Sequence, residues 1–166
     1  AEIAVESALT GHQVLSTMHC NDAPGAVTRL DDMGIAPFLI SSSVILSCAQ
    51  RLMRRICPAC KEEYKPEKDV FIQLNLDPRE WDGIRLYRGL GCERCKNTGY
   101  SGRVAIIEAM EVSDEIRKMV IQRSSGSEIM KVAVSQGMMQ LRGVALEKVK
   151  AGLSTFEQVV DATGSH

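Results

Sequence analysis

The sequence has no hydrophobic run long enough to cross a membrane. Its longest apolar stretch, residues 38–49, has about a dozen residues and contains four serines, whereas a membrane-spanning helix needs about 20 apolar residues. No signal peptide opens the chain, which begins at Ala1 inside a segment with the pattern of an amphipathic helix. We therefore expect a protein without a transmembrane segment, and we expect this chain to be a piece of a longer one.

The sequence also lacks an excess of charge of either sign, and it has few aromatic residues. The formal net charge at pH 7 is −1, and Phe, Trp and Tyr make up 4% of the chain. A protein that binds nucleic acid usually combines a basic surface with aromatic side chains that stack on bases. The composition therefore argues against nucleic acid, and against an anionic membrane, as the partner.

Four of the six cysteines form two C-x-x-C pairs, Cys57 with Cys60 and Cys92 with Cys95. This spacing lets both thiolates of a pair face one metal ion, and two pairs complete a tetrahedral zinc site. Two disulfides, as in small secreted proteins, and a redox-active pair are the alternatives. We predict a structural Zn²⁺, because four protein ligands leave no open position for a reacting water. Reduced thiols, zinc and the lack of an export signal favour a cytoplasmic location.

Residues 1–56 alternate between helical and strand-like patterns, which is typical of an α/β domain. A short strand is predicted over residues 13–18, and a helix follows with Asp22 as its N-cap. Another helix is predicted from about residue 37 to about residue 50.

His19 lies between the predicted strand and the predicted helix. In open α/β sheets this is a place where phosphate binds, because helix N-termini present free backbone N–H groups. A lone histidine here is also commonly a cap or a surface residue. His12 lies at the other end of the same strand, so on geometry alone the two histidines should not meet at one ligand.

The rest of the chain divides into two further parts. Residues 57–110 are predicted to form a zinc-binding tetracysteine subdomain with flanking strands, one of them over residues 103–110. Residues 111–166 are predicted to form a C-terminal helical bundle whose first helix is capped by Ser113.

Several motifs together resemble one protein family. They are the run from Thr10 to His19, the run Asp32-Met33-Gly34-Ile35, the four cysteines, and the run from Thr98 to Arg103. In this order they resemble bacterial secretion ATPases, the motors of type II secretion and type IV pilus assembly. The resemblance extends over nearly the whole chain, and the run from Tyr87 to Gly89 is somewhat more similar to the pilus extension branch.

The resemblance implies a partial RecA-like P-loop ATPase core in residues 1–56 and a protein that works as a hexamer. It also implies an inner-membrane platform protein as partner, at the cytoplasmic face of that membrane. The two histidines of the family's histidine box would be His12 and His19, and both would belong to the nucleotide site. Cys20 stands where the family usually has Thr, a nearly isosteric change.

The sequence contains no G-x-x-x-x-G-K-[ST] motif. Without that phosphate-binding loop and its Mg²⁺ ligands, phosphoryl transfer loses most of its electrostatic stabilisation. We therefore expect ATP and Mg²⁺ to be cofactors of the whole protein and not of this chain alone. Two alternatives to a motor ATPase remain: a zinc ribbon that binds nucleic acid through Arg51, Arg54 and Arg55, and a purely structural adaptor.

Overall fold

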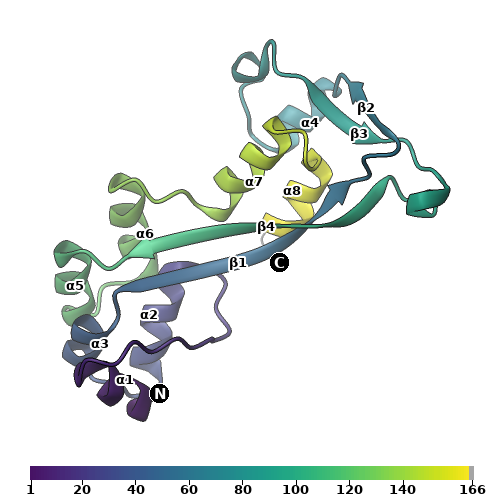
Figure 1. Cartoon of the computed structure of the whole chain (residues 1–166). Coiled ribbons are helices and arrows are strands. Elements are labelled where there is room, and N and C mark those ends of the chain that lie inside the picture. The colour runs from purple at the N-terminus through teal and green to yellow at the C-terminus, as the bar shows by residue number, and fades with distance from the viewer. Residues whose placement is uncertain (165–166) are drawn as a thin grey trace. The chain divides into compact units, whose positions relative to one another are not determined.

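The computed structural model describes residues 1–164, and the side chains in that range other than those of Lys68 and Gln73. The chain is a mixed α/β protein (Figure 1). Its elements divide into two compact units, one formed by Ala1–Gln50 and Ile107–Gln140, the other by Arg51–Ile106 and Leu141–His166. Each unit therefore combines segments that are far apart in the sequence.

The first unit is mainly helical. Its helices are α1 (Glu2–Leu9), α2 (Ala23–Asp32), α3 (Pro37–Ser43), α5 (Asp114–Ile121) and α6 (Gly126–Ser135). Helix α3 packs on α1 and α5, and α2 packs on α6. The side chains of Ile40, Ile116 and Ile129 are almost completely buried, so aliphatic residues rather than aromatic ones fill this core.

The second unit contains a small hairpin and a separate group of helices. Strands β2 (Lys61–Tyr64) and β3 (Leu86–Gly89) pair antiparallel. The helices are α4 (Lys68–Gln73), α7 (Leu141–Lys150) and α8 (Phe156–Thr163), with two 3₁₀ turns at Pro78–Trp81 and Glu93–Cys95. The buried rings of Phe71, Trp81 and Phe156 contact one another and form the aromatic part of this core.

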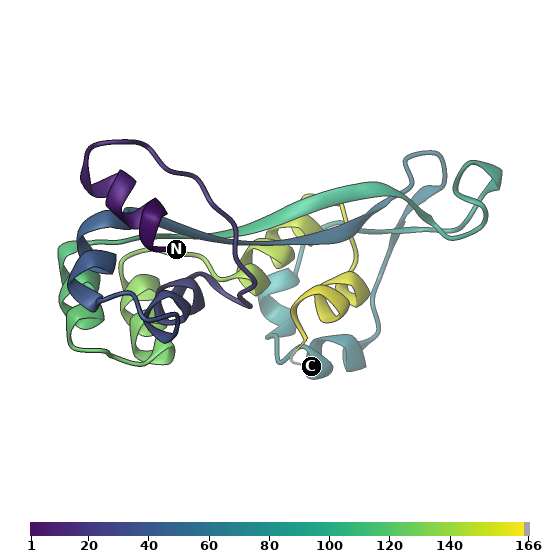
Figure 2. The ribbon, with the colours of Figure 1, turned by 90° about the horizontal axis from the view of Figure 1, so that it is seen from below.

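Two long strands, β1 (Leu46–Ile56) and β4 (Tyr100–Glu111), pair with each other in a two-stranded sheet. They run side by side in both views (Figures 1 and 2). In β4 every second residue from Ile106 to Met110 is buried, as the two-residue period of a strand requires. The strand predicted over 103–110 is confirmed and is slightly longer than expected.

The helix predicted from residue 37 to residue 50 is wrong in its second half. Helix α3 ends at Ser43, and the chain continues as β1 from Leu46. The hydroxyls of Ser41, Ser42 and Ser43 donate to carbonyls of the preceding turn, which weakens a helix. Pairing with β4 then favours the extended conformation for the residues that follow.

The strand predicted over residues 13–18 is also wrong. These residues have no regular secondary structure and pair with no other strand among the described residues, and every side chain from His12 to Met18 is exposed. A strand needs a partner for its backbone N–H and C=O groups. The sequence pattern of a strand could not provide that partner.

The helices after residue 111 are present, and the N-cap predicted at Ser113 is confirmed. The Ser113 hydroxyl accepts a hydrogen bond from the Ile116 amide at 3.3 Å, as expected of an N-cap. Helices α5 and α6 belong to the first unit, whereas α7 and α8 belong to the second. The segment predicted as one helical bundle is thus divided at Gln140. No helix in residues 1–164 is long and apolar enough to cross a membrane.

Candidate functional site

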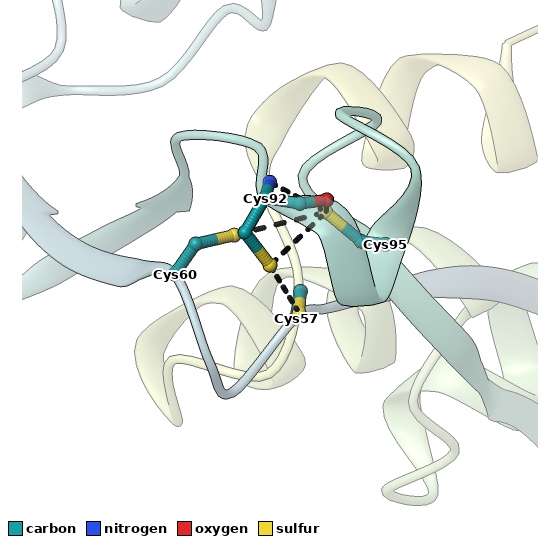
Figure 3. A group of neighbouring side chains, drawn as sticks. All are labelled: Cys57, Cys60, Cys92 and Cys95. Atoms are coloured by element: carbon teal, nitrogen blue, oxygen red, sulfur yellow. Dashed lines mark hydrogen bonds between the residues drawn. The ribbon is translucent and has the colours of Figure 1, made fainter.

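The two C-x-x-C pairs come together in the second unit (Figure 3). The Sγ atoms of Cys57, Cys60, Cys92 and Cys95 all lie within 4.8 Å of one another. The Sγ–Sγ distances are 3.9 Å for Cys57–Cys92, 3.9 Å for Cys60–Cys95 and 3.7 Å for Cys92–Cys95. A tetrahedral zinc ion with Zn–S bonds of about 2.3 Å would hold its sulfurs about 3.8 Å apart. The four thiols therefore fit a tetrahedral metal ion.

The two disulfides considered as an alternative are not formed. A disulfide requires sulfurs about 2.05 Å apart, and all six cysteines are free. The spacing of the sulfurs is that of ligands around a common centre.

Backbone hydrogen bonds hold the two cysteine pairs against each other. The first pair lies in the loop between β1 and β2, and the second lies in the 3₁₀ turn after β3. The amide of Cys57 donates to the carbonyl of Gly99 at 2.9 Å, and the amide of Leu90 donates to the carbonyl of Cys60 at 3.0 Å. The antiparallel pairing of β2 with β3 connects the same two segments. The protein backbone thus positions all four thiols.

Three backbone amides also donate to the sulfurs. Gly91 donates to Cys60 at 3.3 Å, while Cys92 and Gly99 donate to Cys95 at 3.1 and 3.3 Å. Amide donors stabilise a negatively charged sulfur, and metal-binding cysteines are thiolates. This arrangement suits a cation at the centre of the cluster.

The pKa values of two of these thiols differ strongly. Burial raises the pKa of Cys60 to about 12, against the Gly91 amide that lowers it. Burial also acts to raise the pKa of Cys95, but the amides of Cys92 and Gly99 and the neighbouring thiols outweigh it and lower this pKa to about 6. Four thiols this close cannot all ionise without a compensating cation. A bound metal ion would supply that charge and deprotonate its ligands.

A second candidate site lies at the start of α2, in the first unit. An open pocket of about 240 Å³ is lined by His19, Cys20, Asn21, Asp22, Gly25, Thr28, Arg29 and Asp32. The carboxylate of Asp22 accepts a hydrogen bond from the Gly25 amide at 2.7 Å. The N-cap predicted from the sequence is therefore confirmed, and His19 is one of the residues that line the pocket beside it.

The first turn of α2 does not offer free amides to a phosphate. The Ala23 amide donates to the Glu108 carboxylate at 2.8 Å, the Gly25 amide is bonded to Asp22, and Pro24 between them has no N–H. An anion site at a helix N-terminus depends on unbonded amides in this turn. The amides of this turn are therefore already bonded, and a contact of His19 with a phosphate stays a prediction.

His12 is not among the residues that line this pocket. It is exposed, and its Nδ1 lies 3.1 Å from the Thr10 hydroxyl and 3.3 Å from the Ser7 carbonyl oxygen. A role in binding nucleotide stays a prediction for both His12 and His19.

Glu108 is the residue that the sequence analysis missed. It occupies an inward-facing position of β4 between Ile106 and Met110, and it is only 2% exposed. A charged residue at a core position of a strand is unusual, because a buried carboxylate must be compensated by hydrogen bonds or charge. The run Ile106-Ile107-Glu108-Ala109-Met110 carried this signal.

Comparison with known proteins agrees with the resemblance seen in the sequence. Residues 1–161 match the family model of type II/IV secretion system proteins. Over 98% of its length the chain is 48% identical to the type IV pilus assembly ATPase PilB of Thermus thermophilus and 47% identical to that of Myxococcus xanthus. It is 43% identical, again over 98% of its length, to the type II secretion system ATPase E of Vibrio cholerae.

These matches cover 18%, 29% and 32% of the three relatives, so the chain spans a third or less of the length of each. The resemblance predicted from the sequence is confirmed, and the chain belongs to the type II/IV secretion system protein family.

Proposed function

We propose that this chain is the C-terminal part of a hexameric motor ATPase that drives type IV pilus assembly or type II protein secretion. The observation that carries the proposal is the 48% and 43% identity, over 98% of the chain, to relatives named as ATPases of these two machines. The run from Tyr87 to Gly89, which is somewhat more similar to the pilus extension branch, favours pilus assembly. In this proposal residues 1–56 are part of a RecA-like core, and the cytoplasmic hexamer acts on an inner-membrane platform protein.

We further propose that Cys57, Cys60, Cys92 and Cys95 hold a structural Zn²⁺. The donor set and the sulfur spacing support this assignment. When bound, zinc would balance the charge of the thiolates and cross-link the two loops. The amides of Gly91, Cys92 and Gly99 orient the sulfurs. Metal analysis of reduced protein should find one zinc per chain, and the absence of any bound transition metal would contradict the assignment.

The isolated chain should not hydrolyse ATP, because its sequence has no G-x-x-x-x-G-K-[ST] loop to hold the phosphates. Isothermal titration calorimetry of the chain with Mg-ATP should show no tight binding. Binding at micromolar ATP would contradict this expectation.

The role proposed for His19 can be tested in a longer protein that contains this chain together with the phosphate-binding loop. Loss of a side chain that stabilises the transition state lowers kcat by about 10²- to 10³-fold, and we expect a loss of this order for His19→Ala. Lys131→Ala, which changes an exposed cation on α6, is the matched control and should retain activity. Equal rates for the two variants would exclude a role for His19. An unmodified longer protein without ATPase activity would contradict the function itself.

A further inference from the structure

The buried carboxylate of Glu108 is not needed to fill the core. Its neighbours on the same face of β4, Ile106 and Met110, are fully buried apolar residues, and another apolar side chain would suit the same row. A carboxylate at this position costs desolvation energy, and replacing a buried charge by an apolar residue of similar volume is often neutral or even stabilising. Its presence therefore indicates a requirement other than packing.

One hydrogen bond of Glu108 points to such a requirement. Its Oε1 accepts the Ala23 amide at 2.8 Å, across 85 positions of sequence. Ser47, on β1, donates its hydroxyl to the carbonyl of the same Ala23 at 2.8 Å. Both polar backbone groups of one fully buried residue are thus held by side chains from two paired strands.

Ala23 is the first residue of α2 and directly follows the segment that borders the pocket. Asp22, immediately before it, caps the helix, and His19 to Asp22 line the pocket. Because Ala23 is held at both its N–H and its C=O, its peptide planes cannot rotate freely. The direction in which the preceding residues leave the helix is therefore set by Glu108 and Ser47.

We propose that Glu108 is a positioning residue whose buried carboxylate, through the Ala23 amide, holds the His19–Asp22 segment in the arrangement that forms the pocket. The effect on segment geometry is independent of the reaction. The effect on catalysis rests on the proposed function, in which His19 belongs to the nucleotide site.

The geometric part is tested in this chain by amide hydrogen exchange and by NMR of the histidine rings. Glu108→Leu removes the acceptor and keeps an apolar fit, whereas Glu108→Gln keeps an acceptor oxygen without the charge. We expect exchange of the Ala23 amide to quicken on the order of tenfold in Glu108→Leu, the factor typical of a lost buried hydrogen bond. The His19 ring resonances should shift in the same variant, while those of His12 stay unchanged.

Two further variants make this test decisive. Glu111→Leu introduces the same substitution at an exposed position of the same strand and should leave the Ala23 amide and His19 as they are. Glu108→Gln should resemble the unmodified chain. The proposal is overturned if Glu108→Leu leaves Ala23 exchange unchanged, if Glu111→Leu quickens it equally, or if Glu108→Gln is as disruptive as Glu108→Leu. If Glu108→Leu does not fold, Glu108→Met makes the same test with an unbranched apolar side chain, and unchanged exchange of the Ala23 amide in that variant would overturn the proposal.

The catalytic part is tested by steady-state kinetics in the longer ATPase. A misplaced His19 should lower kcat on the order of tenfold in Glu108→Leu, with a smaller change in the KM for ATP, and Glu108→Gln should restore the rate. If kcat is unchanged although the Ala23 amide exchanges faster, Glu108 has no positioning role in catalysis. If the longer protein has no ATPase activity at all, the proposed function fails, and the exchange data still decide whether Glu108 positions the segment.

Discussion

Replacing Gly89 by alanine should loosen the cysteine cluster without touching any cysteine. Gly89 is the last residue of β3, and its backbone packs directly on that of Gly99. A Cβ at position 89 would lie 2.7 Å from the Gly99 Cα and even closer to its carbonyl oxygen. No side-chain rotation can relieve an overlap with backbone atoms, so Gly99 would have to move. Its carbonyl accepts from the Cys57 amide and its amide donates to the Cys95 sulfur, so both cysteine pairs would be disturbed.

The size of this effect follows from the geometry. Overpacking a well-packed region lowers the free energy of unfolding by about 1–3 kcal/mol. We expect the upper end of this range, because the added Cβ would overlap backbone atoms that cannot rotate away. A loss of about 3 kcal/mol lowers the Tm of a chain of this size by about 6–12 °C. The fluorescence of Trp81, the single tryptophan, reports on unfolding of the same unit. The zinc content of the variant should fall as well.

Gly102→Ala is the control. Gly102 lies in the same unit with φ at +78°, but a Cβ there would meet no atom within 4 Å. The alanine variant should lose about 1 kcal/mol of the free energy of unfolding, through backbone strain alone. The zinc content of this variant should be normal. If Gly89→Ala unfolds at the same temperature as Gly102→Ala and keeps its metal, the reasoning from the close approach of Gly89 to Gly99 is refuted.

Three further predictions concern other parts of the chain. Removal of zinc by a chelator should make residues 57–102 sensitive to protease and leave the rest resistant, because metal binding contributes about 10–16 kcal/mol to small zinc sites; unchanged resistance of this segment would contradict it. Phe156→Ala removes a ring that is 1% exposed and 4.9 Å from the Trp81 ring. Phe156→Ala should lower the free energy of unfolding by about 3–5 kcal/mol and shift the fluorescence emission of Trp81 to the red. A decrease below about 1 kcal/mol would contradict the packing of these rings. The Ser125 hydroxyl, followed by the Ser125 amide, lowers the pKa of Glu128 in the capping box of α6. Because this pKa is lowered by folding, the carboxylate stabilises α6 above its unfolded pKa, and the stabilisation is lost as the pH falls through the folded pKa. Glu128→Gln should therefore lower the protection of the α6 amides from hydrogen exchange at neutral pH and have little effect at a pH below the folded pKa of Glu128. An equal effect at the two pH values would contradict the capping box.

The features predicted correctly from the sequence depend on residues close together in the chain. Asp22 and Ser113 cap their helices through amides three residues away, so the signal for each cap lies within one helical turn. The two C-x-x-C pairs were recognised for the same reason, because the spacing within each pair determines how both sulfurs can face one ion.

Other features depend on contacts between distant segments, which a local pattern does not specify. Residues 46–50 could have continued a helix, and pairing with β4 makes them a strand. Residues 13–18 have the composition of a strand, but no partner strand is present in the part of the chain that the structure describes. The bond between Glu108 and Ala23 spans 85 positions. The backbone groups of a strand and a buried carboxylate both need hydrogen-bond partners, and these partners come from segments remote in sequence. The tertiary structure therefore determines these features, because the local sequence pattern does not contain the partners.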